Sequence, residues 1–183
     1  MSRGCLYPVV GPSGAGKDTL IDAARAARPD IHVPNRWITR AEGAGGEVHV
    51  AATEAAFEAE RTAGGFAFHW RAHGLAYGIP AEIEGHLAAG RSVVFNGSRG
   101  ILAEARARFA PLRIIVVTAP DAVLAARLAA RGRETAADIA ERLSRAHYAV
   151  PDGDDVTVIQ NDGSVADGIA TFLAALTPQP ERA

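Results

Sequence analysis

Eight consecutive residues near the start of the chain have the composition of a phosphate-binding loop. The segment reads Gly11-Pro-Ser-Gly-Ala-Gly16-Lys17-Asp18, and it lies between an apolar run and a helical pattern. Glycines there let backbone N–H groups point inward around phosphate oxygens, and the N-terminus of the following helix adds a partial positive charge. Lys17 is then placed to reach the terminal phosphates of ATP. The residues expected to bind the nucleotide are Gly11, Pro12, Ser13, Gly14, Ala15, Gly16, Lys17, Asp18 and Thr19.

Lys17 is also the single lysine of the chain, whose other 18 basic residues are all arginine. An arginine-rich genome explains the general bias. A compact, flexible ammonium is nevertheless kept at the one position where a phosphate loop needs a point charge instead of a planar fork.

The residue after the lysine departs from the usual loop pattern. Ser or Thr at that position supplies a hydroxyl to Mg²⁺, whereas this chain has Asp18, followed by Thr19. A carboxylate is a hard oxygen ligand, so we expect Asp18 to bind Mg²⁺. The alternative is that Asp18 only stabilises the helix N-terminus through its charge.

A second departure lies at the end of the apolar run Ser92–Phe95. The run ends in Asn96, where P-loop kinases commonly carry an aspartate near the metal. The loop has thus gained a carboxylate that the strand tip lacks. We interpret the two departures together as a transposition of the metal-facing charge from the strand tip to the loop.

Apolar runs that must position these residues have the length and composition of buried parallel strands. The predicted strands are Cys5–Val10, Ser92–Phe95, Leu112–Thr118 and Val156–Gln160. A helical pattern follows each one, over Lys17–Ala27, Ser98–Phe109, Pro120–Arg131 and Val165–Leu176, with a further helix over Ala136–Tyr148. This alternation predicts an α/β fold with a doubly wound, mainly parallel sheet.

Two segments interrupt the alternation. Asn35–Ala89 contains short aromatic, glycine-rich pieces before a helix at Pro80–Ala89, and Arg131–Arg145 is polar, with Gly132 as a hinge. We expect both to move over a ligand. The expected organisation is one domain with a core over 1–34, 90–126 and 150–183, a small acceptor-binding insertion over about 35–89, and an arginine-bearing lid over about 127–149.

Composition limits the partners of the chain. Its 183 residues fit one compact domain, and 48% hydrophobic content allows a real core. A formal net charge of −2 gives no basic surface for a nucleic-acid partner. No apolar stretch has transmembrane length and the first residues lack a signal-peptide layout, so we expect a cytoplasmic protein with no membrane partner. The oligomeric state stays open.

With these parts placed, the chain from Leu6 to about Leu176 resembles the guanylate-kinase-like nucleoside monophosphate kinases. The resemblance rests on the phosphate loop, on Tyr77-Gly78, on Arg127-Leu128-Ala-Ala-Arg131-Gly132-Arg133-Glu134 and on Val158-Ile159-Gln160-Asn161-Asp162. It implies that Arg127, Arg131 and Arg142 act in catalysis by contacting phosphate, although a solvated helix face is the alternative for each. It also implies that Asn161 binds the adenine of ATP; a plain Asn-Asp-Gly turn is the alternative there.

A closer likeness is to one branch, the ribose 1,5-bisphosphate phosphokinases of phosphonate catabolism. The motifs that carry it are Gly16-Lys-Asp-Thr19, Trp70-Arg-Ala-His73-Gly-Leu-Ala-Tyr77-Gly-Ile-Pro80 and Asn96-Gly97-Ser98-Arg99. The branch implies ATP as co-substrate, Mg²⁺ as cofactor, and ribose 1,5-bisphosphate as the small phosphorylated acceptor. The implied product is 5-phosphoribosyl 1-diphosphate.

The acceptor region agrees with this branch. Guanine presents N–H donors, yet residues 61–81 contain no Asp or Glu, and Ile79-Pro80 replaces the usual hydroxyl. Buried donors without partners would each cost about 1–3 kcal/mol. Guanidinium groups, by contrast, suit an acceptor with two phosphates. The expected acceptor-binding residues are Arg36, Arg40, Arg71, Tyr77, Asn96 and Arg99.

Several alternatives remain open. The chain could be a guanylate kinase with degenerate acceptor contacts, or a catalytically silent guanylate-kinase-like interaction module. His69 and His73 are four residues apart, as a helical metal pair would be, but the surrounding glycines and aromatics favour a strand and a turn. Phe66, Phe68 and Trp70 alternate with period two, which predicts one core-facing side of a strand.

Overall fold

The computed structural model describes residues 3–41, 48–130, 132, 135, 140 and 150–177 of the chain. Apart from Ala140, the predicted helix Ala136–Tyr148 lies outside the described residues, and so do the lid residues Arg131 and Arg142. No helix of the described ranges combines the length and the apolar character that a membrane crossing requires.

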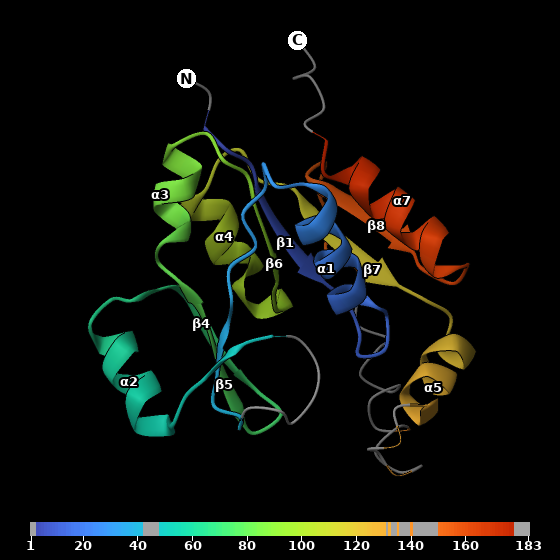
Figure 1. Cartoon of the computed structure of the whole chain (residues 1–183), viewed down its shortest axis with the longest axis horizontal. Helices are drawn as coiled ribbons and strands as arrows, with labels where there is room; N and C mark the ends of the chain where they lie inside the picture. Colours follow the sequence, from blue (N-terminus) through green and yellow to red (C-terminus); the bar gives the residue numbers. More distant parts are fainter. Residues whose placement is uncertain are drawn as a thin grey trace.

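The main sheet consists of four parallel strands, and each corresponds to a predicted apolar run (Figure 1). The strands are β1 (Leu6–Val10), β6 (Val93–Asn96), β7 (Ile114–Thr118) and β8 (Val156–Gln160), in the spatial order β6-β1-β7-β8. Buried apolar side chains fill β1 completely, as expected of a central strand covered on both faces.

Helices cover both faces of this sheet. One core cluster packs α1 (Lys17–Ala27), α5 (Asp121–Ala130) and α7 (Val165–Ala175) against alternate strand residues such as Tyr7 and Val9. On the opposite face, α3 (Ile83–Ala88) and α4 (Leu102–Arg108) pack against the other set, which includes Leu6. The predicted doubly wound α/β fold is therefore confirmed. The helix predicted over Ser98–Phe109 begins instead as a 3₁₀ turn, Arg99–Ile101, that continues into α4.

A second, mixed sheet lies within the segment that interrupts the alternation. It contains β2 (Trp37–Ile38), β3 (Val50–Ala51), β4 (Phe66–Ala72) and β5 (Leu75–Pro80), in the order β3-β2-β5-β4, and α2 (Glu54–Thr62) packs against it. His73 and Gly74 form the two-residue turn between β4 and β5, with φ angles of 53° and 74°. His69 and His73 thus lie on a strand and a turn, as the sequence favoured.

The aromatic alternation along β4 does not produce one core-facing side, so that prediction was wrong for Phe66. A register shift between Phe66 and Phe68 changes the face on which Phe66 lies. Phe66 contacts Phe57 of α2 at 4.8 Å between ring centroids, whereas Phe68 packs against Phe95 at 5.8 Å. One extra residue in a strand is not visible in a period-two pattern.

Phe68 also belongs to the hydrophobic core that the second sheet shares with the main sheet. Arg108 of α4 adds a polar connection: its Nη1 donates to the carbonyl oxygen of Ala67 at 2.5 Å and its Nη2 to Glu84 at 3.0 Å. In Figure 1, the second sheet and α5 lie on either side of the loop that follows β1. The second sheet is thus fixed beside the carboxyl ends of the main strands.

Candidate functional site

The candidate site lies at the carboxyl ends of the main strands, where the connections that leave neighbouring strands run to different sides. β1 has β6 on one side and β7 on the other, so the connections that leave their carboxyl ends diverge. Ligands of open α/β sheets bind at such a point. The phosphate loop follows β1, Asn96 ends β6, and Asn161 directly follows β8.

Two glycines of the loop are required by its shape. Gly11 has a φ of 148°, and a Cβ there would lie 1.9 Å from the carbonyl oxygen of Val117. Gly16 has a φ of 92° at the N-cap of α1, and a Cβ there would lie 2.6 Å from Nδ2 of Asn161. Any larger residue would strain the backbone and open the loop, so the glycine spacing noted in the sequence is a steric requirement.

The side chain of Lys17 is hydrogen-bonded to the main chain of the loop. Its Nζ donates to the carbonyl oxygens of Gly11 at 2.7 Å and Pro12 at 2.8 Å. These bonds fix the ammonium beside the first two loop residues. A point charge with three rotatable donors can satisfy both carbonyls and still approach a phosphate oxygen.

Asn161 stabilises the loop through a side-chain hydrogen bond. It is buried, and its Nδ2 donates to the carbonyl oxygen of Ala15 at 2.8 Å. Its Oδ1 lies against Gly168 of α7, where a Cβ would approach it to 2.3 Å. These contacts connect the loop to α7, and the contact with adenine that the resemblance implied stays a prediction.

A cavity of about 280 Å³ opens beside the loop. Its lining residues are Gly14, Gly16, Thr19, Leu20, Arg127, Ala130, Asn161 and Val165. Within the described ranges, Nη1 of Arg127 is buried with no hydrogen-bond partner. Because buried guanidinium nitrogens are normally paired, this atom favours a ligand that brings an acceptor. The structure therefore places Arg127 beside the loop, and its expected contact with phosphate stays a prediction.

Arg36 is central among the residues expected to bind the acceptor. The residue is only 7% exposed, and its Nη1 donates to the carbonyl oxygen of Asn96 at 2.7 Å. Its guanidinium carbon lies 5.4 Å from the ring centroid of Tyr77 and 5.8 Å from that of Trp70. The two rings are stacked, with an interplanar angle of 5°. A cation oriented in this way is prepared for an anionic ligand.

The other arginines expected to bind the acceptor differ in their surroundings. Arg40 follows β2, its Nη2 lies 3.5 Å from Nδ1 of His49, and its buried Nε has no hydrogen-bond partner among the described residues. Arg99 starts the 3₁₀ turn that follows β6.

Arg71 is not brought to this group. Side chains alternate across a strand, so Arg71 points to the face opposite Trp70 and pairs there with Glu54 and Glu58 of α2. The guanidinium groups of Arg61 and Arg71 lower the pKa of the Glu58 carboxyl. Sequence distance alone could not distinguish the two faces of β4.

Trp70 is the residue that the sequence reasoning missed. It packs against the core that contains Phe68, as its assignment to a core-facing side predicts, but it is only half-buried and also lies under Arg36. The signal was present: a His-Gly turn between Trp70 and Tyr77 places the two residues opposite each other in a hairpin, and they are indeed paired.

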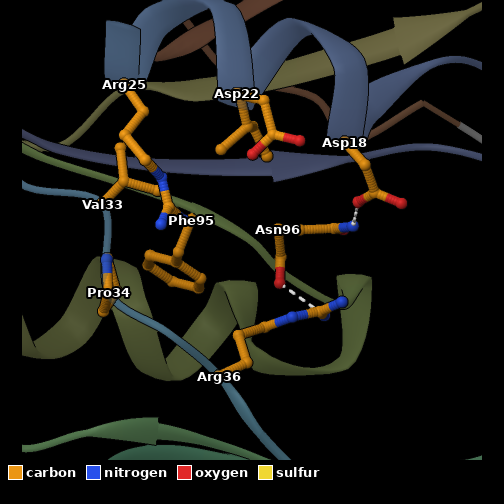
Figure 2. A pocket seen from close by; sticks show the side chains of 9 residues that line it. Asp18, Asp22, Arg25, Val33, Pro34, Arg36, Phe95 and Asn96 are labelled. Atoms are coloured by element: carbon orange, nitrogen blue, oxygen red, sulfur yellow. Dashed lines mark hydrogen bonds between the residues drawn. The ribbon is translucent and has the colours of Figure 1, made fainter. Parts of the chain in front are cut away.

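Asp18 is the candidate ligand for a divalent cation. Its Oδ1 accepts a hydrogen bond from Nδ2 of Asn96 at 2.6 Å (Figure 2). In the part of the chain that the structure describes, no group of three or more His, Cys, Asp or Glu side chains could hold a metal ion. One carboxylate that works together with nucleotide phosphates and water is nevertheless a common way to bind Mg²⁺. The hard oxygen donor therefore fits this ion.

The amino-acid sequence is similar to those of curated phosphokinases. It is 49% identical over 177 residues to "Ribose 1,5-bisphosphate phosphokinase PhnN" of Rhizobium etli, covering 95% of this chain and 90% of the relative. It is 50% identical over 173 residues to the protein of the same name from Pantoea vagans, covering 93% and 96%. A "Bifunctional ribose 1,5-bisphosphokinase-thymidine phosphorylase" of Azorhizobium caulinodans is 45% identical, but this chain spans 27% of its length. No protein-family model matches the chain.

Among solved structures, a guanylate kinase from Anaplasma phagocytophilum has a similar fold. The TM-score is 0.65, and the match covers 96% of this chain and 85% of the other. The two sequences are 18% identical, so the likeness shows the fold alone.

Proposed function

The chain belongs to the ribose 1,5-bisphosphate phosphokinase family, and from this membership we propose that it transfers the γ-phosphoryl group of ATP to ribose 1,5-bisphosphate. The product is 5-phosphoribosyl 1-diphosphate, a step that we place in phosphonate catabolism. The observation that carries the proposal is the identity of 49% and 50% to two curated members over nearly their whole length.

The proposed chemistry needs no general base. An oxygen of the acceptor's 1-phosphate attacks the γ-phosphorus, a new P–O–P bond forms, and the bond to ADP breaks. Because the second pKa of a phosphate monoester is near 6, the attacking oxygen is already ionised at neutral pH. Alignment and neutralisation of charge are then the main requirements.

Residues on the nucleotide side supply that neutralisation. Lys17 lies in the loop at the end of β1 and takes the terminal phosphates. Asp18 would hold Mg²⁺, which neutralises the charge that spreads over the phosphates during transfer. Arg127, with its buried and unpaired Nη1 within the described ranges, adds a cation beside the loop. Arg131 and Arg142 are proposed to act in the same way from the lid.

Residues on the acceptor side hold the sugar bisphosphate. Buried Arg36, oriented over Trp70 and Tyr77, is proposed to bind one phosphate of the acceptor. Arg40, whose buried Nε has no hydrogen-bond partner among the described residues, and Arg99 are proposed to assist. We assign Arg71 only a supporting role, since it pairs with α2.

The remaining parts of the proposal concern organisation. Residues 35–89 would form the acceptor-binding insertion and residues 127–149 the lid of a single domain. The partners would be two small molecules, ATP and the sugar bisphosphate, within the cytoplasm.

A guanylate kinase is the second candidate, because such an enzyme shares the fold. The absence of Asp and Glu from residues 61–81 opposes it, since guanine donors there would meet no carboxylate from this segment. A silent interaction module is opposed by Lys17 and by the steric need for Gly11 and Gly16, because a scaffold has no use for a phosphate loop.

An assay of the purified protein with ATP and Mg²⁺ tests the proposal. We expect kcat/KM for ribose 1,5-bisphosphate to exceed that for GMP by at least about 10²-fold, or roughly 3 kcal/mol. Comparable turnover of GMP would contradict the proposed acceptor but not the fold. Failure to bind ATP at all would favour the silent module.

A further inference from the structure

We propose that Asn96 is a positioning residue that holds Asp18 on the nucleotide side and Arg36 on the acceptor side in register. It acts on Asp18 through its side-chain amide and on Arg36 through its main-chain carbonyl. The inference rests on the proposed function, because it assigns the two residues to two substrates of one reaction.

The main chain at Asn96 is fixed by the sheet. Asn96 is the last residue of β6 and pairs with Val9 of β1, and the N–H of Gly97 donates to the carbonyl oxygen of Val9 at 2.8 Å. The phosphate loop begins two residues after Val9. Asn96 therefore keeps a constant position relative to the strand that carries the loop.

The side chain of Asn96 is chemically matched to Asp18. An ionised carboxylate only accepts hydrogen bonds, so the group that faces Oδ1 of Asp18 at 2.6 Å must be a donor. The amide supplies one and leaves Oδ2 of Asp18 for another ligand. An aspartate at position 96 would set two carboxylates against each other at this distance. Asn96 is thus the partner that a carboxylate in the loop requires.

The carbonyl of Asn96 orients the other half of the site. It accepts the hydrogen bond from Nη1 of Arg36 at 2.7 Å, so the direction of the guanidinium depends on the strand tip as well as on Trp70 and Tyr77. Figure 2 shows the resulting sequence of contacts, from Arg36 through Asn96 to Asp18. One residue therefore sets the relative position of two charged groups.

A small cavity between α1 and the segment before β2 borders these contacts. The cavity lined by Asp18, Asp22, Arg25, Arg36 and Asn96 has a volume of about 10 Å³. One water molecule needs about 10–15 Å³ measured in this way. No substrate enters from this cavity; the proposal is that Asn96 acts on the substrates through Asp18 and Arg36, and its expected direct contact with the acceptor is decided by the Asn96→Ala variant below.

The test is a swap of donor and acceptor. Asn96→Asp should lower the melting temperature of the substrate-free protein and lower kcat by at least about 10-fold. The double variant Asp18→Asn with Asn96→Asp restores one amide and one carboxylate, so it should recover the melting temperature. The Mg²⁺ midpoint, that is, the Mg²⁺ concentration that gives half-maximal activity, should be higher in this double variant than in the wild type, because the carboxylate now belongs to the strand tip. A double variant no more stable than Asn96→Asp would overturn the proposal.

Asn96→Ala separates positioning from direct contact. It removes the amide but keeps the carbonyl that holds Arg36, so we expect a lower kcat and a higher Mg²⁺ midpoint. The KM for ribose 1,5-bisphosphate should stay within about twofold. A rise in this KM that matches the loss of kcat would show that the amide binds the acceptor, and would overturn the proposal.

Gln160→Glu is the matched control. Gln160 donates from Nε2 to Asp162 at 3.0 Å, also an amide-to-carboxylate contact, but both residues are exposed. Its kinetics and melting temperature should equal those of the wild type, and an equal loss in this control would overturn the specific role of Asn96. If the wild type fails to phosphorylate the sugar bisphosphate, the proposed function fails, whereas the melting temperatures still test the pairing.

Discussion

The ammonium group of Lys17 illustrates how one residue depends on its backbone. Two carbonyl oxygens, those of Gly11 and Pro12, accept its hydrogen bonds within 2.8 Å. The loop that presents these oxygens requires Gly11, which adopts a φ that other residues avoid and leaves no space for a Cβ beside Val117. The position of the charge is therefore built from glycine conformation as much as from lysine.

Removal of that charge should affect the reaction far more than the fold. Lys17→Ala is expected to lower turnover by about 10²-fold or more, because the contact to the transferred phosphoryl group is lost. Lys17→Arg should fail as well, since a planar fork does not fit between two carbonyls. Steady-state kinetics, with circular dichroism as the check on folding, measure both. Near-normal activity in either variant would contradict the assignment of the loop.

Asn161 offers a prediction that distinguishes support from ligand binding. Asn161→Ala leaves the carbonyl of Ala15 without its donor, and should lower the free energy of unfolding of the nucleotide-free protein by about 1–3 kcal/mol. A residue that only contacts adenine would leave this value unchanged. Urea unfolding measures the difference. Asn35→Ala is the control, because Asn35 is exposed and accepts one hydrogen bond from Arg25.

Residues in continuous motifs were predictable, whereas residues that depend on pairing across strands were not. The loop with Lys17 and Asp18 is recognisable because all its members lie within one short segment. Trp70 and Arg71 are adjacent in the sequence but point to opposite faces of β4, and only the register of the hairpin decides which one meets Arg36. The support of the loop by Asn161 depends on contacts between residues 146 positions apart.

Among the elements, the main strands and their helices were the most predictable. Strand β8 and helix α1 have the predicted bounds, because the run Val156–Gln160 is rich in β-branched residues and α1 begins directly after the glycine loop, although β8 lies at the sheet edge and is only partly buried. The second sheet lacks such signals. Strands β2 and β3 have two residues each, which is too short for any periodicity. Helix α2 is rich in Ala and Glu and was missed, although Thr53 caps it by accepting from the N–H of Ala56.

A histidine pair connects the segment before β2 to α3 and should make stability depend on pH. The rings of His32 and His86 are stacked at 3.8 Å, and Glu82 and Arg91 also face His32. Burial lowers the pKa of His32 and the charge of His86 adds to the effect, while Glu82 opposes it. The unfolded chain, with a histidine pKa of about 6.5, therefore binds more protons. The stability that His32 contributes is therefore fully present above about pH 6.5, and it is lost as the pH falls through the lower pKa of His32 in the folded state.

We therefore expect the melting temperature of the wild type to fall between about pH 7.5 and about pH 5.5, and to fall less in His86→Gln. Differential scanning calorimetry at both values measures the change. His69→Gln removes an exposed histidine and should keep the wild-type dependence. If the melting temperature falls equally with pH in the wild type and in His86→Gln, the histidine pair does not have this role.

At the scale of the whole molecule, the two sheets share one core and should unfold together. Phe68 of β4 packs against Phe95 of β6, so Phe68→Ala should destabilise both sheets by about 3–5 kcal/mol. The two tryptophans, Trp37 and Trp70, lie in the second sheet, so their fluorescence follows that sheet, while far-UV circular dichroism follows all elements. Both signals should show one urea midpoint, shifted equally in the variant.

Separate midpoints would show that the second sheet unfolds on its own. His69→Ala, on the exposed side of the same strand, should change stability by no more than about 0.5 kcal/mol and serves as the control.

The single lysine has a practical consequence for handling the protein. Reagents that acylate primary amines can modify one side chain, Nζ of Lys17, and otherwise the α-amino group at the chain end. Molecules coupled to a sensor chip through Lys17 would be attached by the phosphate loop and would not bind nucleotide, whereas those coupled through the α-amino group would keep the loop accessible. Acylation followed at Lys17 itself, for example by peptide mapping, would then count accessible loops, with protection by MgATP as the sign of a correctly occupied loop.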